Sequence, residues 1–295
     1  MVSIVIVDWN AGPGLDAALA SVAAEGMAGL EVVLVDNGST DGSARAAAAR
    51  HPWVRSMETG VNLGFAGGAN RGAAAASGDP IVFLNPDARV LPGAVARLVA
   101  ALAAEPQAAI AGGGLVHPGG SWQPGAARFG PVAHLLLDTT LGRLLARRRR
   151  RAYRVDWVYG TFMAVRRDVF AALGGFDERY FLYGEDLDLC WRAARLGRTT
   201  LHVPAARVVH GANVSARARF GHGREAQVVR GEMLFYATWG RAALARFRAV
   251  AIAKFGTKAL VAALLRRRAA ATTYAAVVRA CITGDVGCPA PSRAG

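Results

Sequence analysis

The chain is poor in cysteine, in lysine and in long uncharged apolar runs. Its three cysteines, among 295 residues, form no Cys-x-x-Cys pair and no even set for a disulfide framework, so we expect a reducing, cytoplasmic environment. No uncharged apolar run reaches the length of about 18 residues that a membrane-spanning helix requires. Residues 1–7 enter a strand-like run and do not resemble a cleaved signal peptide. These absences argue against a disulfide-stapled secreted domain and against a membrane span.

Acidic residues are also scarce in the second part of the chain. The formal net charge is +14: residues 1–120 hold 6 basic against 10 acidic residues, whereas residues 121–295 hold 29 basic against 11 acidic residues. Such an excess suits a polyanionic partner, either an anionic membrane surface or a nucleic acid. Only two of the 35 basic residues are lysines, a bias that a GC-rich genome also produces. Because no recognised nucleic-acid-binding motif accompanies the charge, no nucleic-acid partner is expected.

Strand-like and helix-like runs alternate over the first hundred residues. We predict strands at 2–7, 31–35, 54–58 and 81–84, and helices at 15–25, 43–50, 66–77 and 93–104. This alternation is typical of right-handed βαβ units around a mostly parallel sheet, which indicates the α/β class. Further along we expect strands at 155–166 and 203–210, a short helix at 167–173, and basic helices between 225 and 279.

Polar residues follow three of the predicted strands. In α/β sheets ligands bind beyond the carboxyl ends of the strands, so we predict a site from the pairs Asp8 and Asn10, Asp36 and Asn37, and Asn85 and Asp87. Asp36 can accept the imide N–H of a pyrimidine base or a ribose hydroxyl. Asp87 can bind a divalent cation that bridges two phosphates. Residues 1–120 carry a net negative charge and would repel a diphosphate unless such a cation lay between them. Asn-Gly and Asn-Pro turns are the ordinary alternative.

A glycine-rich segment, residues 62–72, leads into the third predicted helix. Its glycines, including the donor-binding candidate Gly64, allow close backbone approach, and Asn62, Asn70 and Arg71 are candidates to contact sugar or phosphate at a helix N-terminus. Glycine-mediated helix packing is the alternative. Earlier in the chain, Gly12-Pro13-Gly14 begins a dinucleotide-type fingerprint. The match is weakened because Pro13 lacks the N–H that a pyrophosphate cradle uses. An NAD(P)-dependent oxidoreductase is therefore only the second interpretation of this sequence.

Three carboxylates crowd into four positions at Glu185, Asp186 and Asp188, between aromatic residues and a basic helix. Repulsion and partial desolvation make such a cluster costly, so it is a candidate for a general base or a metal ligand. A solvated helix N-terminus, which also favours acids, is the alternative. His210, at the end of the last strand-like run, is a candidate metal ligand, although a single histidine is more often structural.

Taken in order, these motifs resemble glycosyltransferase family 2, which has the GT-A fold, and its rhamnosyltransferase-like members. The resemblance covers roughly residues 1–215 and is carried by residues 5–10, 35–43, 62–66, 84–87, 174–178, 184–186 and His210. It implies a nucleotide-sugar-binding half in residues 1–120, an acceptor-binding and catalytic half of the same domain in 121–215, and a helical extension in 216–295. Asn85 departs from the Asp-x-Asp metal motif common in the family, a variant frequent in the rhamnosyltransferase-like branch.

The resemblance also assigns roles to residues. Asp36 would bind the base, Asp87 the metal and diphosphate, and Asp186 would be the catalytic base of an inverting transfer that uses Mg²⁺ or Mn²⁺. The expected donor is dTDP-rhamnose, with a UDP-sugar as the alternative, because uracil and thymine share the imide edge. The acceptor-binding candidates are Trp157, Phe181, Tyr183, Glu185 and Asp188.

The basic C-terminal helices suggest where the acceptor is found. Residues 243–268 mix apolar residues with arginine and lysine, as a helix on an anionic membrane surface does. This pattern would suit a polyprenyl-linked or glycan acceptor in cell-envelope assembly, with the protein peripheral on the inner face of the plasma membrane. A helical cap with a solvated basic face fits the pattern equally well.

Overall fold

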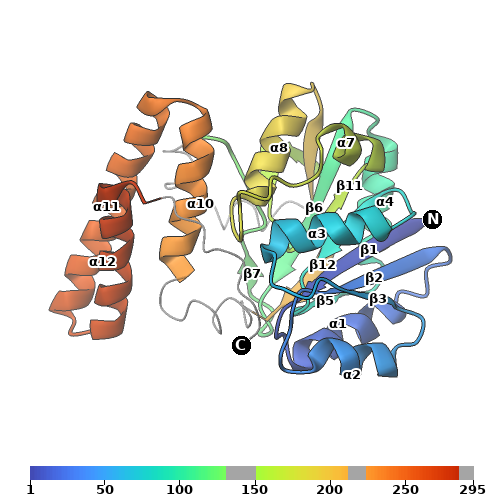
Figure 1. The fold of residues 1–295 in the computed structure, drawn as a ribbon. Coiled ribbons are helices and arrows are strands. Elements are labelled where there is room, and N and C mark those ends of the chain that lie inside the picture. Colours follow the sequence, from blue (N-terminus) through green and yellow to red (C-terminus); the bar gives the residue numbers. More distant parts are fainter. Residues whose placement is uncertain (131–150, 212–223, 286–295) are drawn as a thin grey trace.

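A computed structural model describes residues 1–130, 151–211 and 224–285, and Figure 1 shows its arrangement. The first half is a run of parallel strands in the order β3-β2-β1-β4, formed by β1 (Val2–Asp8), β2 (Leu30–Asp36), β3 (Arg55–Glu58) and β4 (Ile81–Leu84). Their connections are α1 (Pro13–Ala23), α2 (Ser43–Arg50) and α3 (Gly64–Ala75). The α/β class and the mostly parallel central sheet are confirmed.

The second half of the sheet mixes strand directions. β11 (Phe162–Val165) lies antiparallel between β4 and β6 (Ala108–Val116), and β12 (Thr199–His210) follows parallel to β6. β5 (Ala88–Val90) closes this edge antiparallel to β12. The short strands β7 (Trp122–Gln123), β8 (Ala126–Ala127), β9 (Tyr153–Val155) and β10 (Trp157–Val158) lie beside them.

The prediction of one strand over residues 155–166 is wrong. This stretch forms parts of β9, β10 and β11, and β10 pairs with β8 in a separate two-stranded sheet. The carboxylate of Asp156 turns the chain here, because it accepts hydrogen bonds from the Phe129 N–H at 2.7 Å and from Arg128 at 3.1 Å. Gly160 and Thr161 then form a second turn, after which the chain enters the main sheet as β11.

Helices cover both faces of the sheet. α1, α2 and α4 (Ala94–Ala104) contribute to one apolar core, and α3, α7 (Arg167–Ala172) and α8 (Glu185–Arg195) pack on the opposite face. Two glycines of α3 allow its close approach: a Cβ on Gly72 would lie 2.4 Å from Val5, and one on Gly68 would lie 2.7 Å from Val7. Glycine-mediated packing therefore accounts for these two positions.

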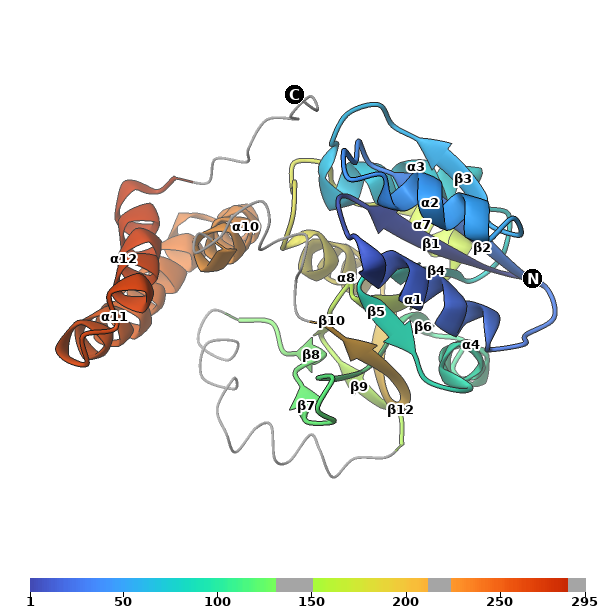
Figure 2. The same ribbon diagram turned by 90° about the horizontal axis from the view of Figure 1, so that it is seen from below.

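Three C-terminal helices stand to one side of the sheet: α10 (Arg224–Thr238), α11 (Arg241–Leu264) and α12 (Arg268–Thr283) (Figures 1 and 2). The expected helical extension is thereby confirmed. The Trp191 ring of α8 lies 5.9 Å from that of Phe235 in α10 and 6.3 Å from that of Trp239, which follows α10, between centroids. Within the described ranges, no helix is both long and apolar enough to cross a membrane.

Candidate active site

The end of β1 carries a buried carboxylate. Asp8 is 0% exposed, and its Oδ2 accepts hydrogen bonds from the hydroxyls of Ser43 at 2.8 Å and Ser39 at 3.0 Å. Its Oδ1 accepts the Ala11 N–H at 3.2 Å. Burial raises the pKa of Asp8, and the two hydroxyls oppose that rise. Asp8 was predicted to contact the donor, but these contacts place it between the loops after β1 and β2, where it positions both.

Asn10 and Asp36 lie at the same edge. Asn10 takes the left-handed conformation (φ 53°), and its Oδ1 accepts the N–H groups of Thr40 at 2.8 Å and Asp41 at 3.2 Å. Asp36 is the register partner of Asp8 across β1 and β2. Its Oδ1 accepts the Ser39 N–H at 2.8 Å, and the residue is partly exposed. Asp36 therefore presents its carboxylate at the surface where the parallel strands end.

Two buried amides shape the start of α3. Asn37 donates to the Gly64 carbonyl at 2.9 Å and to the Asn62 Oδ1 at 3.2 Å, and that oxygen also accepts the Gly64 N–H at 2.9 Å. A Cβ on Gly64 would lie 2.3 Å from the Phe181 carbonyl oxygen, which also accepts the Phe65 N–H at 2.8 Å. Asn37 and Asn62, both predicted donor contacts, thus fix the start of α3, and the third, Gly64, lies against Phe181.

Asn70 serves a comparable role farther along α3. Its Nδ2 donates to the Phe176 carbonyl at 2.9 Å and to Glu178 Oε1 at 3.0 Å, while its Oδ1 accepts the Phe176 N–H at 2.9 Å. Both amide hydrogens are used by the chain itself. Asn70 therefore fastens the 175–178 loop to α3, and its contact with the donor stays a prediction.

Asp87 and His210 meet at the end of the sheet. His210 Nε2 lies 3.3 Å from Asp87 Oδ1, and the two side chains are 7% and 9% exposed. Gln123 orients the imidazole, because its Oε1 lies 3.3 Å from His210 Nδ1 and its Nε2 donates to the His210 carbonyl at 3.0 Å. The structure thus brings the two predicted metal ligands together.

Asp87 and His210 have the chemistry of a partial metal site. His210 Nε2 is buried and has no hydrogen-bond partner in the described parts of the chain, while Asp87 supplies a carboxylate beside it. No group of three potential His, Cys, Asp or Glu ligands occurs among those residues. Two protein ligands with open positions fit a cation that takes its remaining oxygens from a diphosphate and water. Asn85 lies two residues before Asp87 in the chain, and its N–H donates to the Thr161 carbonyl at 3.0 Å.

The acid cluster begins helix α8, and each carboxylate has a different environment. Asp186 is partly exposed, and its Oδ2 accepts the Gly160 N–H at 2.8 Å. The next residue, Thr161, accepts the Asn85 N–H through its carbonyl. Gly160 and Thr161 therefore connect Asp186 to the loop that carries Asp87.

Glu185 and Asp188 face away from solvent. Glu185 is 5% exposed, and burial together with the neighbouring Asp186 raises its pKa well above the usual range. Asp188 is 3% exposed, and its Oδ2 accepts from Arg192 Nε at 2.6 Å. Arg192 in turn donates to the Leu173 carbonyl at 2.8 Å. Asp188 therefore forms a buried ion pair with Arg192, and the predicted acceptor contact of the two acids stays a prediction.

The aromatic candidates are likewise mostly internal. Trp157 and Phe181 are 6% and 5% exposed, and Trp157 packs on Tyr159 with ring centroids 4.8 Å apart. Tyr183 is partly exposed, and its hydroxyl accepts from Arg224 Nε at 3.0 Å. Burial raises the pKa of Tyr183, and the charge of Arg224 opposes this. Of the three, Tyr183 retains the exposure that contact with an acceptor needs.

Helix α10 braces the segment that carries Asp186, residues 180–186, called here the 180–186 turn. Tyr183 and Gly184 have φ values of 72° and 97°, so the turn uses the left-handed region twice in succession. A Cβ on Gly231 of α10 would lie 2.1 Å from the Tyr183 carbonyl oxygen. The C-terminal helices therefore contact the turn directly.

Comparisons with known proteins identify the family. The model described as glycosyl transferase family 2 matches residues 3–174. The chain belongs to this family. It is 35% identical over 229 residues to the N-acetylglucosaminyl-diphospho-decaprenol L-rhamnosyltransferase of Mycobacterium tuberculosis, a match that covers 70% of this chain and 75% of that protein. A shorter match, 44% identical over 66 residues, covers 22% of this chain and 25% of rhamnosyltransferase WbbL of Escherichia coli.

Solved structures support the fold of this family 2 enzyme. Mannosyltransferase PcManGT from Pyrobaculum calidifontis, in complex with GDP-Man and Mn²⁺, has a TM-score of 0.62 at 19% identity, with 96% of this chain and 86% of that chain covered. GalNAc-T7 with UDP, GalNAc and Mn²⁺ has a TM-score of 0.58 at 21% identity, and the match spans 73% of this chain but 44% of that one. The chain is thus a rhamnosyltransferase-like glycosyltransferase with the GT-A fold.

Several positioning residues escape sequence reasoning. Ser39 and Ser43 hold Asp8, Gln123 orients His210, and Gly160 holds Asp186 through its N–H. Their residue types are ordinary in loops, and their partners lie far away in sequence. Gly231 leaves a weak signal, because glycine in a helix interior is costly and therefore implies a close contact.

Proposed function

We propose that this glycosyltransferase moves rhamnose, with inversion, from dTDP-rhamnose to a hydroxyl of a lipid-linked glycan. The observation that carries the proposal is the linkage of Asp186, through Gly160 and Thr161, to the loop that bears Asp87 and His210. A general base and a diphosphate-binding pair at one edge of a sheet are what a direct displacement at an anomeric carbon requires.

Asp186 is the proposed base. The acceptor hydroxyl gives its proton to the Asp186 carboxylate as its oxygen forms a bond to the anomeric carbon. The bond from that carbon to the diphosphate oxygen breaks, and the electron pair leaves with the dTDP. Attack opposite to the leaving group inverts the anomeric centre. The Gly160 N–H fixes the direction of the carboxylate at 2.8 Å, and the Leu187 N–H contacts its other oxygen at 2.7 Å.

Asp87 and His210 are the proposed holders of Mg²⁺ or Mn²⁺. When bound, such a cation neutralises charge that develops on the departing diphosphate. Asp87 supplies a hard oxygen ligand and His210 a buried nitrogen whose ring is oriented by Gln123. The net-negative charge of residues 1–120 adds an electrostatic reason for the cation.

Asp36 is the proposed contact for the base. A carboxylate at this position can accept the imide N–H of thymine or of uracil, so a UDP-sugar is the alternative donor. The M. tuberculosis relative is named as an L-rhamnosyltransferase, and the name favours rhamnose for this chain too. The same name specifies a decaprenyl diphosphate-linked acceptor, which favours a polyprenyl-linked substrate in cell-envelope polysaccharide or glycolipid assembly.

A thermal-shift panel tests the donor and the metal together. dTDP, dTDP-rhamnose, UDP, UDP-glucose and GDP-mannose are added with Mn²⁺, with Mg²⁺ or with a chelator. The proposal predicts the largest increase in melting temperature with dTDP-rhamnose and a divalent cation, and a smaller one with the chelator, because only ligands bound by the folded state stabilise it. D87A should abolish the effect of the cation. A larger shift with a UDP-sugar would replace the donor, and equal shifts with and without chelator would reject the metal.

A further inference from the structure

Apolar side chains are exposed at one end of the C-terminal helices, where α11 turns into α12. Leu260, Val261, Leu264 and Leu265 are 61, 48, 74 and 59% exposed. The other large apolar side chains that are exposed in the described chain are separated from one another in sequence: Met1, Trp53, Leu196, Trp239 and Ile282. Four of them within six residues form a continuous apolar tip, which costs free energy in water and marks a surface that something covers.

The apolar tip continues directly into Arg266, Arg267 and Arg268, all exposed. Residues 233–284 contain no acidic residue, but they contain seven arginines and two lysines. The positive charge is therefore not balanced within these helices. A second copy of the same surface would be repelled, and a nucleic acid would leave the leucines uncovered. A surface that combines an apolar interior with anionic headgroups complements both features.

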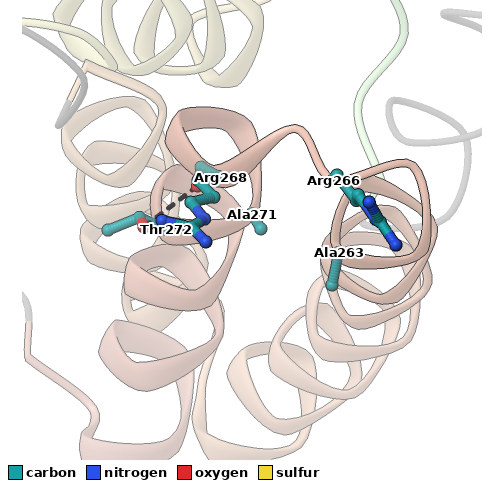
Figure 3. Close-up of a pocket in the computed structure, with 5 residues that line it drawn as sticks. All are labelled: Ala263, Arg266, Arg268, Ala271 and Thr272. Carbon is teal, nitrogen blue, oxygen red and sulfur yellow. Dashed lines mark hydrogen bonds between the residues drawn. The ribbon is translucent and has the colours of Figure 1, made fainter.

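A cavity of about 570 Å³ lies at the same turn, lined by Ala263, Arg266, Arg268, Ala271 and Thr272. Figure 3 shows Arg266 and Ala263 on the end of α11, and Arg268, Ala271 and Thr272 on the start of α12, across the gap between the two helices. Each of the two helices thus has one arginine beside the cavity, and a guanidinium there can bind a phosphate by charge-assisted hydrogen bonds.

We propose that the α11–α12 turn docks on an anionic lipid bilayer, with the apolar tip among the acyl chains and a lipid phosphate in the Arg266–Arg268 cavity. This contact does not depend on the identity of the donor. Because α10, of the same helical unit, touches the 180–186 turn through Gly231, docking would bring the proposed base toward lipid-linked acceptors.

Vesicle flotation of the full chain tests the proposal. Wild type should float with phosphatidylcholine vesicles that contain phosphatidylglycerol, less at high salt, and weakly with phosphatidylcholine alone. L264S/L265S should reduce the partition coefficient by about tenfold or more. L196S is the matched control, because Leu196 is 56% exposed outside the helical unit and should have no effect. The proposal would be overturned if the wild type stayed unbound at low salt. It would also be overturned if L264S/L265S bound the vesicles as strongly as the wild type.

The cavity is tested with two charge-matched variants. R266Q/R268Q removes the two arginines that line it, and R267Q/R279Q removes two exposed arginines outside it. Each arginine close to the membrane contributes about fivefold to the partition coefficient. R266Q/R268Q should therefore lower it by about 25-fold, and R267Q/R279Q by about fivefold or less. Equal losses would show a diffuse electrostatic contact and reject the phosphate site. If light scattering showed that the wild type is a dimer and L264S/L265S a monomer, the apolar tip would be covered by a second copy of the chain, and the membrane proposal would fall.

Discussion

Replacing Gly231 by alanine tests whether the C-terminal helices set the geometry of the 180–186 turn. The new Cβ would lie 2.1 Å from the Tyr183 carbonyl oxygen, whereas an ordinary contact is 3.4 Å or more, so the turn or α10 has to move by about 1.3 Å. Overpacking of this kind costs about 1–3 kcal/mol of stability. A shift of about 1 Å in a reacting group can lower kcat by about 100-fold.

Gly256 provides the matched control for this substitution. It also lies inside a C-terminal helix, and a Cβ there would meet nothing within 4 Å. G256A should therefore stabilise the protein by about 0.5–1 kcal/mol through helix propensity and leave kcat unchanged. Urea unfolding and steady-state transfer kinetics measure both quantities. G231A with wild-type kcat and stability would refute the idea that α10 braces the turn.

Three further substitutions test the roles that the structure assigns to buried polar residues. E185Q should flatten the pH dependence of stability. Because the pKa of Glu185 is raised in the folded protein, the folded wild type keeps a proton that the unfolded chain loses above the ordinary glutamate pKa of about 4.5. Wild-type stability therefore falls as the pH rises above that value, and the melting-temperature gap in favour of E185Q should widen. A constant gap would contradict this assignment. D188N should lower the free energy of unfolding in urea by about 3 kcal/mol, because it removes the buried charged partner of Arg192, and the KM for the acceptor should stay unchanged. A raised KM for the acceptor at wild-type stability would instead support acceptor contact. N70A should cost about 1–3 kcal/mol through the unpaired Phe176 backbone, with unchanged donor KM; donor KM rising without a loss of stability would favour donor contact.

The sequence predicts the regular part of the fold well, because local patterns determine it. The helix expected at 43–50 is found at Ser43–Arg50, and the strand expected at 81–84 at Ile81–Leu84. Polar residues at strand ends also identify the correct edge of the sheet, since parallel strands end together. The insertion of β11 between β4 and β6 was not predictable in this way, because antiparallel pairing between distant segments leaves no local periodicity.

The roles of individual polar residues were harder to predict than their location. Asn37 and Asn70 have the residue type and the position of donor contacts, yet their amides bind backbone groups of neighbouring loops. An amide that ties two loops and one that binds a sugar use the same donors and acceptors. Burial distinguishes them, and burial depends on long-range packing. Domain limits at 120 and 215 remain predictions. The sequence also has a basic run at 147–151, which lies outside the described residues except for the exposed Arg151.

The central claim is that Asp186 is the base of a transfer whose donor is held by other residues. Single-turnover transfer by D186N, together with donor binding by calorimetry, tests it most directly. Asparagine keeps an oxygen to accept the Gly160 N–H but cannot take the acceptor proton at neutral pH. We predict a fall in the rate of about 100-fold or more, with donor affinity within about twofold of wild type. D186N that transfers sugar at the wild-type rate would contradict the account.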